Sequence, residues 1–410
     1  MNYLTLEKLY YKNPNSYENE YAARFGAPFT QHLDFQIRQT GWPTAYPAFY
    51  CYTDEVVGFL VRIYKSTQRV DELVRQTPSV ALAQLKNLSM REDIYSTNNI
   101  EGVSSSRQEI QTAIENQQKE YSKKRFYSVI NKYAMLGNKG EIPFQSCEDL
   151  RNFYDSFLRD EICLDNPHKL PDGTLFRKNG VSVISNGARV LHEGIVPEEK
   201  IISTMSYALG VLNDTTVPAL IRIALYHYLF GYIHPFYDGN GRTSRFISAY
   251  YLGHELHELI GLRFSIAVKK RLKDYYHAFE QTTSDRNRGD LTPFVLVFLD
   301  IVLDAAQGLE KHLRGKLAQL TQYHGALLKY LSQKKLDGDE TLHQLCYILI
   351  QAAMFSRAGA MIGQLVQALG KSRNTVDTKL NKLPPECLVK DKRGRQYYYK
   401  FNVLTLRPFL

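Results

Sequence analysis

The spacing of apolar residues along the chain predicts a mainly helical protein. Apolar side chains recur every three or four positions through Val57, Leu60 and Val61, and the same spacing returns after a break at Pro78. It also predicts helices over residues 104–165, 197–213, 220–232, 246–259 and 294–301, and a basic amphipathic helix over 311–335. Residues 1–50 are rich in tyrosine, proline and asparagine and lack this periodicity. We expect them to form an irregular arm packed on the main body.

The pattern changes to short apolar runs between residues 176 and 195. Apolar residues at 181–184 and 190–191 flank the pair Asn186-Gly187. Asn-Gly is a preferred hairpin turn because both residues tolerate positive φ, so the sequence predicts two short strands around it. The pattern alone leaves open whether this hairpin caps a helical bundle or binds something.

The last hundred residues have a character of their own. An apolar-spaced helix ends at Gly370, Ser372 caps a second helix, and residues 388–399 alternate about a basic glycine turn. This order resembles a helix-turn-helix followed by the hairpin of a winged-helix domain. We expect four regions: an N-terminal helical or irregular region (1–89), a helical core (90–305), a helical linker (306–340) and a winged-helix domain (341–410).

Basic residues outnumber acidic ones from residue 371 to residue 400. Such an excess on a helix-turn-helix and its wing predicts contacts with DNA phosphates. The candidate contacts are Lys371, Arg373, Lys392, Arg393 and Arg395. A protein-interaction module fits the moderate charge as well, so DNA binding and formation of a homodimer both stay open.

Composition sets broader limits. An apolar content of 44% and a charged content of 23% are ordinary for a globular protein, and a net charge of +9 is a mild bias toward nucleotides or nucleic acid. The first 13 residues are too polar for a signal peptide, and we expect a cytoplasmic protein with no membrane partner. The five cysteines are scattered without paired spacing, which predicts reduced core residues rather than a zinc site or disulfides.

The stretch from His234 to Arg245 gathers the groups needed to handle a polyphosphate. It reads His-Pro-Phe-Tyr-Asp-Gly-Asn-Gly-Arg-Thr-Ser-Arg, with an apolar run on each side. The proline ends the first helix, so a second helix should begin near Asn240. Backbone amides from Gly239 to Arg242 would then face an anion at a helix N-terminus. The two arginines are three positions apart and share one face of that helix.

Two further groups in this stretch suggest chemistry. Asp238 would repel a phosphate ligand unless a hard cation such as Mg²⁺ lay between them. His234 is a base with an ordinary pKa near neutrality. On composition alone, a solvated, charged turn between two helices remains an alternative.

The stretch resembles the signature of the Fic family, His-Pro-Phe-x-Asp-Gly-Asn-Gly-Arg-x-x-Arg, and all nine specified positions are filled. The resemblance implies a mainly α Fic (Fido) core, in which the hairpin near residues 176–195 is a flap that holds the target protein by strand addition. It also implies a protein adenylyltransferase, which moves AMP from Mg-ATP to a hydroxyl group of the target and releases pyrophosphate. The cofactor is then Mg²⁺ and the substrate ATP.

The resemblance also implies a role for each residue of the signature. His234 would take the proton from the target hydroxyl and Asp238 would hold Mg²⁺. Gly239, Asn240 and Gly241 would bind the α-phosphate, Arg242 the β-phosphate and Arg245 the γ-phosphate, while Phe236 would be buried to fix the loop. Tyr275 and Tyr276, downstream of the signature, are candidates for flanking the adenine, although a tyrosine stripe is more often part of a core.

A second stretch, Ser96-Thr97-Asn98-Asn99-Ile100-Glu101-Gly102, lies upstream of the core. Thr97 and Glu101 are four positions apart, so they share a helix face, and Gly102 is a natural helix stop. Alone, this pattern is typical of a solvated helix end. Beside the signature it resembles the family's inhibitory motif, Ser/Thr-x-x-x-Glu-Gly/Asn, in which the glutamate pairs with the second arginine, here Arg245. Such a pair would occupy the fork that the γ-phosphate needs.

Two functions are therefore compared. The first is an adenylyltransferase restrained by Glu101, which modifies a Ser, Thr or Tyr hydroxyl of a target protein and of itself, and whose C-terminal domain delivers it to DNA or to a partner. The alternative is a DNA-binding transcriptional regulator whose Fic core only senses nucleotide. The complete signature favours the enzyme, because a sensor has no need of a base at His234.

Overall fold

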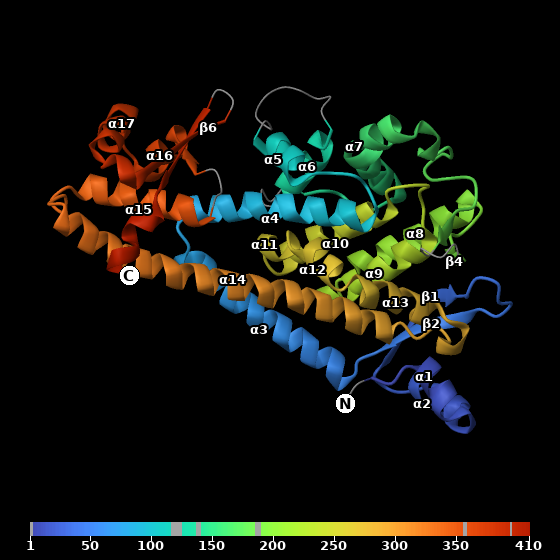
Figure 1. Cartoon of the computed structure of the whole chain (residues 1–410). Coiled ribbons are helices and arrows are strands. Elements are labelled where there is room, and N and C mark those ends of the chain that lie inside the picture. The colour runs from blue at the N-terminus through green and yellow to red at the C-terminus, as the bar shows by residue number, and fades with distance from the viewer. Residues whose placement is uncertain (1–2, 116–124, 137–140, 185–189, 356–358, 394–395) are drawn as a thin grey trace. The chain divides into compact units, whose positions relative to one another are not determined.

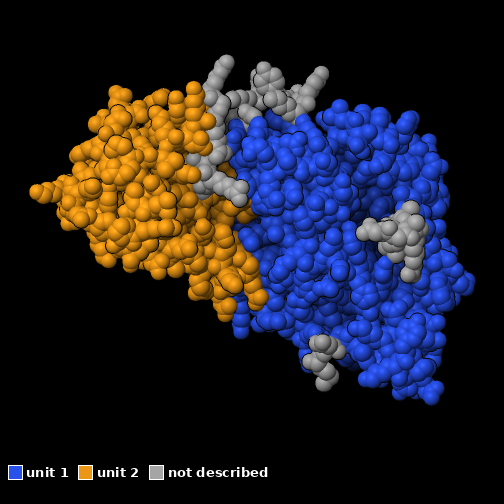
Figure 2. All heavy atoms as spheres, viewed as in Figure 1, with its two compact units in different colours: residues 1–67, 90–306 blue, residues 68–89, 307–410 orange. Residues whose placement is uncertain are grey.

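The computed structural model describes residues 3–410 except 116–124, 137–140, 185–189, 356–358 and 394–395. The described chain is mainly helical, which confirms the predicted fold class (Figure 1). It divides into two compact units: residues 1–67 and 90–306 form unit 1, and residues 68–89 and 307–410 form unit 2 (Figure 2). The four predicted regions stay a prediction, and the two units are described separately below.

The prediction of an irregular N-terminal arm is wrong. Helices α1 (Leu6–Lys12) and α2 (Tyr17–Phe25) are followed by an antiparallel pair of strands, β1 (Thr30–Ile37) and β2 (Tyr46–Cys51). The last four residues of β2, from 48 to 51, are all buried. A strand covered on both faces has no alternation of apolar and polar residues, which explains why the pattern hid it.

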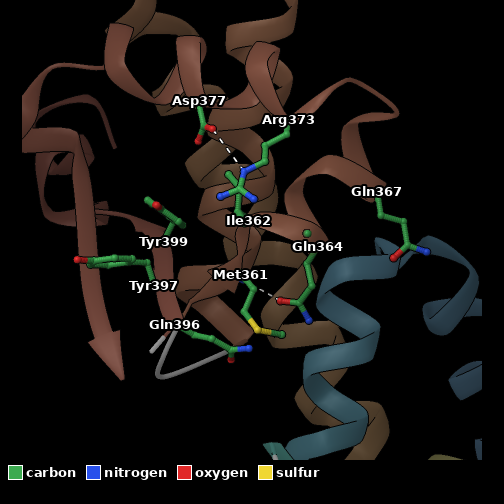
Figure 3. Close-up of a pocket in the computed structure, with 10 residues that line it drawn as sticks. Met361, Ile362, Gln364, Gln367, Arg373, Asp377, Gln396, Tyr397 and Tyr399 are labelled. Carbon is green, nitrogen blue, oxygen red and sulfur yellow. Dashed lines mark hydrogen bonds and ion pairs between the residues drawn. The ribbon is translucent and has the colours of Figure 1, made fainter. Parts of the chain in front are cut away.

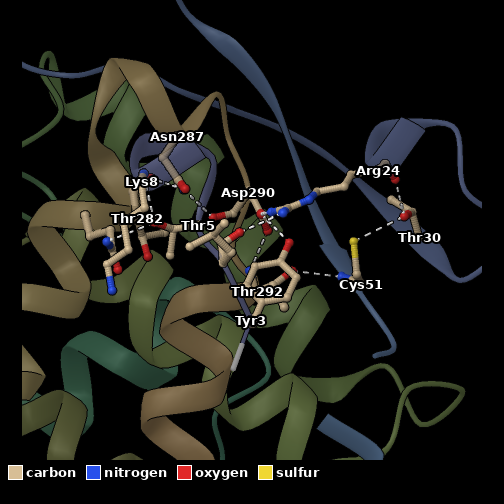
Figure 4. A network of polar contacts seen from close by, with 12 residues as sticks. Tyr3, Thr5, Lys8, Arg24, Thr30, Cys51, Thr282, Asn287, Asp290 and Thr292 are labelled. Atoms are coloured by element: carbon tan, nitrogen blue, oxygen red, sulfur yellow. Dashed lines mark hydrogen bonds and ion pairs between the residues drawn. The ribbon is translucent and has the colours of Figure 1, made fainter. Parts of the chain in front are cut away.

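A buried polar network fastens the N-terminal segment to unit 1 (Figure 4). The carboxylate of Asp290 is fully buried and accepts hydrogen bonds from Tyr3 Oη (2.5 Å) and from the backbone of Thr292 (2.9 Å). Thr292 Oγ1 in turn accepts from the backbone of Cys51 at 3.0 Å, at the end of β2. Burial raises the pKa of Asp290, while these donors and Arg24 favour its charged form. The network thus connects the chain's first residues, β2 and the start of a later helix.

Two long helices follow, α3 (Asp54–Gln76) and α4 (Ser79–Ile100), and the predicted break at Pro78 lies between them. The stretch that resembles the inhibitory motif lies at the end of α4, with Glu101 and Gly102 just beyond its last residue. The buried Asp93 lies four positions before Thr97, on the same face of α4. It accepts hydrogen bonds from Ser265 N (2.8 Å), Ser265 Oγ (2.9 Å) and Tyr133 Oη (3.0 Å). Burial raises the pKa of Asp93 to about 6. This carboxylate fixes α4 to the N-terminus of helix α12 (Phe264–Lys270).

The Fic-like core of unit 1 is built from helices around one central helix. In chain order the elements are α5 (Arg107–Glu115), α6 (Tyr127–Met135), α7 (Cys147–Asp165), α8 (Glu198–Asn213), α9 (Ala219–Ile233), α10 (Asn240–Glu255), α11 (Glu258–Gly261), α12 (Phe264–Lys270) and α13 (Leu272–Thr283). Helix α9 packs against α8 and α10 and is buried on nearly every side. Because it has no solvated face, its apolar residues run almost without interruption.

The predicted hairpin is present in the core as two short antiparallel strands, β3 (Ser182–Ile184) and β4 (Val190–Glu193). The predicted turn at Asn186-Gly187 lies outside the described residues. After β4 the chain leads directly into α8, and β4 contacts the N-terminal hairpin through a hydrogen bond from Glu193 N to Thr40 Oγ1 (3.0 Å).

Helix α14 (Thr292–Gln333) is one continuous helix of 42 residues, where the sequence predicted separate helices over 294–301 and 311–335. The intervening residues contain no proline, and Ala305, Ala306 and Leu309 favour helix, so the single Gly308 does not end it. By length and composition α14 is the one described helix that could cross a membrane. Its most apolar window has a mean hydropathy of 1.6 and is 67% buried, as is typical of a core helix.

Unit 2 ends in a small helical and stranded module. Its elements are α15 (Glu340–Phe355), β5 (Ala360–Met361), α16 (Ile362–Leu369), α17 (Arg373–Lys382), β6 (Leu388–Arg393) and β7 (Gln396–Phe401), with strand order β5-β7-β6. Gly370 ends α16 with a φ of 62°, and the Ser372 side chain accepts from Thr375 N at the start of α17. The predicted turn between two helices is therefore observed, while the winged-helix assignment stays a prediction.

Short 3₁₀ helices complete the described elements: η1 (Pro14–Ser16), η2 (Pro167–Lys169), η3 (Asp285–Asn287), η4 (Pro385–Cys387) and η5 (Val403–Phe409).

Candidate active site

The signature forms a turn between α9 and α10, as the sequence predicted. His234 follows α9 in the left-handed region with a φ of 53°, and its amide still bonds to Phe230 O at 2.9 Å. Gly239, with a φ of 80°, precedes the first residue of α10, Asn240. A left-handed conformation is uncommon for a residue with a Cβ, so the backbone of His234 is held by its surroundings.

The loop is held from within by two of its own residues. Phe236 is fully buried and stacks on Tyr154, with ring centroids 3.7 Å apart. The Asn240 side chain accepts a hydrogen bond from Phe236 N (3.0 Å) and donates one to Phe236 O (2.7 Å). The Asn240 amide group therefore closes the loop, and what it can offer a phosphate is its backbone N–H.

The N-terminus of α10 has the form of an anion site. The first amides of a helix, here those of residues 240–242, have no acceptor within the helix and point outward. Beside them, a Cβ added to Gly241 would lie 2.1 Å from Glu101 Oε1. A carboxylate thus already lies where the glycine leaves room for an anion to approach.

Glu101 forms an ion pair with Arg245 across 144 positions of sequence. Glu101 Oε1 accepts from Arg245 Nη2 at 2.6 Å. Thr97 completes the arrangement, since its Oγ1 accepts from Arg245 Nε at 2.9 Å and its carbonyl from Nη2 at 3.3 Å. The arginine side chain is 2% exposed and burial lowers its pKa, but Glu101, Tyr275 and Tyr276 together offset this, so the pKa is raised overall. The Arg245 fork is therefore occupied from two sides.

Arg242, the first arginine of the signature, is paired as well. Its Nη1 donates to Glu161 Oε1 of α7 at 2.8 Å, and its Nη2 lies 3.4 Å from Asp238 Oδ1. Asp238 also receives Lys169 Nζ at 3.1 Å and the Gly239 amide at 2.5 Å. Carboxylates and cations alternate along this edge of the turn.

Asp238 fits a magnesium ion by the chemistry of its donors. Among the described residues no group of three His, Cys, Asp or Glu side chains converges as a metal cage. Mg²⁺ in nucleotide sites does not need one, because one carboxylate and the substrate's own phosphates suffice with water. The Asp238 side chain is 26% exposed beside Arg242, which suits a ligand of that kind.

The imidazole of His234 is uncharged at neutral pH. Burial is the main reason that its pKa falls to about 4, and His192 and Arg177 lower it further. A hydrogen bond with the backbone of Gly231 and the charge of Glu101 act in the opposite direction. One ring nitrogen therefore remains free to accept a proton.

The two tyrosines proposed for the adenine lie near this cluster in different ways. Tyr275 is buried, and its hydroxyl bonds to Nε2 of the buried His227 at 2.7 Å. Tyr276 is 42% exposed. Both tyrosines are within electrostatic reach of Glu101 and Arg245. Of the two, Tyr276 has the free ring surface that stacking on a base requires.

The candidate DNA contacts belong to unit 2 and are described apart from this site. Lys371, Arg373 and Lys392 are exposed, whereas the Arg393 side chain and all of Arg395 lie outside the described residues. Arg373 pairs with Asp377 at 3.7 Å and lines a pocket of about 460 Å³ (Figure 3). Gln364, Gln367, Gln396, Tyr397 and Tyr399 also line it.

The sequence did not predict two charged residues beside the turn, one glutamate and one arginine. Glu161 is one charged residue on an amphipathic helix, and Arg177 precedes the hairpin of β3 and β4 with another basic residue beside it. No local spacing marks either of them, because each acts across the fold. Only a three-dimensional contact identifies them.

Comparison with known proteins defines the class to which this site belongs. Residues 147–252 match the family model described as Fic/DOC family, so the chain contains a Fic/DOC domain. "Protein adenylyltransferase Fic" of Drosophila melanogaster is 39% identical over 88 residues, which cover 22% of this chain and 16% of that protein. The Drosophila willistoni protein of the same name is 30% identical over 128 residues, 30% of this chain and 24% of that protein. Each match thus spans less than a quarter of the curated relative.

A solved structure extends the likeness beyond this domain. A Fic family protein from Desulfovibrio desulfuricans G20 is 22% identical, with a TM-score of 0.51, over 86% of this chain and 97% of that chain. At this identity the likeness concerns the fold alone.

Proposed function

We propose that the chain is a protein adenylyltransferase that is restrained by Glu101. The observation that carries the proposal is an uncharged base, His234, on the same turn as a helix N-terminus flanked by two buried arginines. The names of the Drosophila relatives agree with this activity. The substrates are ATP and a Ser, Thr or Tyr hydroxyl of a target protein.

The proposed reaction is one in-line displacement. His234 takes the proton from the target hydroxyl, whose oxygen forms a bond to the α-phosphorus while the bond from that phosphorus to the bridging oxygen breaks. Pyrophosphate leaves and AMP stays on the target. The amides of residues 240–242 stabilise charge on the α-phosphate, and Arg242 and a released Arg245 bind the outer phosphates. Mg²⁺ bound at Asp238 would neutralise charge on the phosphates.

Labelled nucleotides test the activity directly. The protein is incubated with a cell lysate and with ATP labelled on either the α- or the γ-phosphate. We expect protein to become labelled only from the α-position, because AMP is retained and pyrophosphate is lost. Labelling from the γ-position alone would instead define a kinase, and no labelling from either position, with the restraint removed by Glu101→Gly, would refute the proposal.

Asp238→Ala tests the metal role. We expect Mg²⁺-dependent ATP binding to weaken by about tenfold or more, because the carboxylate is the protein's ligand to the ion. Binding is measured by calorimetry across a series of Mg²⁺ concentrations. Asp160→Ala removes an exposed carboxylate from α7 and serves as the control. An unchanged Mg²⁺ dependence in Asp238→Ala would show that Asp238 is no ligand.

The second candidate function, DNA binding by unit 2, rests on the exposure of Lys371, Arg373 and Lys392 on the helix pair and hairpin. For the full chain, we expect duplex binding whose affinity falls steeply with salt, with a slope reduced by about two when Lys371 and Lys392 are both changed to Gln. The same changes at Lys12 and Lys273, exposed lysines of unit 1, keep the net charge equal. Self-association without DNA binding at low salt would favour the protein-interaction module.

A further inference from the structure

Arg177 is a buried cation that binds carbonyl groups instead of a carboxylate. It is 0% exposed. Its Nε donates to His234 O (2.8 Å), its Nη1 to Asn179 O (2.6 Å) and its Nη2 to Ile195 O (2.9 Å) and Ile233 O (3.4 Å). Among the described residues no acidic side chain pairs with it. Burial accordingly lowers its pKa.

A buried charge without an ion-pair partner is retained only where its hydrogen bonds compensate for lost hydration. Here they do so at a particular place. Ile233 and His234 carry the last carbonyls of α9, the negative end of the helix dipole, where a cation is favoured. A guanidinium reaches all four carbonyls because its five donors spread in one plane, which a lysine cannot imitate.

The four carbonyls belong to three segments that meet at the proposed base. Asn179 precedes β3, Ile195 follows β4, and His234 carries the imidazole. The Arg177 amide adds a fifth hydrogen bond, to Pro235 O at 3.2 Å. Because His234 has a left-handed backbone, its conformation depends on such external contacts. One side chain therefore joins the base of the flap to the turn that orients His234.

Gly194 makes room for this side chain. A Cβ at that position would lie 2.3 Å from Arg177 Nη2 and 3.1 Å from His234 Cβ. Its φ is not positive, so close approach rather than backbone freedom is the reason for glycine here. By contrast, a Cβ at Gly180 would meet nothing within 4 Å.

We propose that Arg177 is the positioning residue of this site: it orients His234 toward the hydroxyl that the flap presents. The proposal rests on the proposed function, since it assigns His234 the role of base. Arg177 itself touches no reacting atom.

The charges around His234 predict the direction in which its pKa changes when Arg177 is replaced. Arg177 and His192, from the flap side, disfavour the protonated ring, whereas Glu101 from α4 and the Gly231 backbone favour it. Loss of the Arg177 charge should raise the pKa of His234 from about 4 toward the ordinary value of 6.5. The shift is partial because burial is the largest cause. The base acts only when it is unprotonated. With a higher His234 pKa, transfer would therefore stop at a higher pH as the solution is acidified.

The test compares four variants in the Glu101→Gly background, in which the restraint is removed: Arg177→Met, Arg177→Lys, Gly194→Ala and Gly180→Ala. For Arg177→Met and Gly194→Ala we expect kcat to fall by about tenfold or more, with the ATP Kd within about twofold of the parent. Arg177→Met should also move the acidic limb of the pH profile upward. Arg177→Lys should also have a lower kcat, but the acidic limb of its pH profile should stay at the pH of the parent. Gly180→Ala should match the parent in both quantities.

A second readout separates this proposal from the proposed function. The His234 ring is titrated by NMR, with its signal assigned by comparison with His234→Ala, and the pKa should rise in Arg177→Met whether or not AMP is transferred. Thermal melting identifies any variant that fails to fold, and Gly194→Ala and Arg177→Lys then remain informative. A folded Arg177→Met with the parent's kcat and the parent's His234 pKa would overturn the proposal. If instead the His234 pKa rises in Arg177→Met but the Glu101→Gly parent itself transfers no AMP, the proposed function is overturned and the positioning role is not.

Discussion

Glu101→Gly is expected to raise the rate of AMP transfer by about tenfold or more. The carboxylate that it removes lies 2.6 Å from Nη2 of Arg245, the proposed γ-phosphate ligand, and against Gly241, where the α-phosphate is proposed to bind. A charge-assisted hydrogen bond of this kind contributes about 1.5–3 kcal/mol, and 1.4 kcal/mol is a factor of ten. Labelled AMP on the protein itself and on lysate proteins is measured over a range of ATP concentrations.

Arg245 supplies the control for this prediction. Arg245→Ala removes both the restraint and the phosphate ligand, so it should not activate. The double variant should resemble Arg245→Ala rather than Glu101→Gly, a non-additivity expected of two residues that share one interaction. Glu115→Gly changes another glutamate of unit 1 that lies on the surface, and should leave the rate as it was. If Glu101→Gly transfers AMP no faster than the wild type at any ATP concentration, the inhibitory role is wrong.

The second large effect is expected from His234→Ala, which should reduce transfer by about 100-fold to 10,000-fold, the usual contribution of a general base. ATP affinity should change by less than about threefold, because arginines and backbone amides bind the phosphates. Both quantities are measured in the Glu101→Gly background. With Glu101 present the pKa of His234 is about 4, and the loss of the Glu101 charge lowers it further. In the Glu101→Gly background we therefore expect transfer to persist through mildly acidic pH and to be lost only as the pH falls to about 4 or below.

His168, an exposed histidine outside the turn, provides the matched replacement, and His168→Ala should behave as the parent. Should His234→Ala lose ATP binding and turnover to the same extent, the imidazole supports the loop and is not the base.

The turn that carries the candidate site was predictable because its parts are contiguous. A proline that ends one helix, a glycine before the next and two arginines one turn apart are local features, and the structure has the break at His234 and the start at Asn240. The pairing of Glu101 with Arg245 was also expected, but from a family resemblance. Periodicity cannot relate two residues that lie 144 positions apart.

The missed features depend on contacts that no short window contains. Strand β2 is covered on both faces, so the alternation that would reveal it is absent. The continuity of α14 through residues 302–310 follows from the lack of a breaker, which is weaker information than the presence of one. Arg177 and Glu161 are ordinary charged residues in sequence, and only burial among carbonyls or beside an arginine distinguishes them.

The anchoring of α4 by Asp93 bears on how a restrained enzyme would switch on. Asp93 is bonded to Ser265 two helical turns before Glu101, whereas the helix ends at Ile100 and Gly102 has a left-handed φ of 70°. Release of Glu101 then requires only that the last turn unwind, while the rest of α4 keeps its place. If that unwinding requires about 1.4 kcal/mol, roughly one molecule in ten is competent at any moment. Basal activity would accordingly come from the small fraction of molecules in which the end of this one helix is unwound. A partner that binds the unwound turn would then act as an activator without contacting the nucleotide.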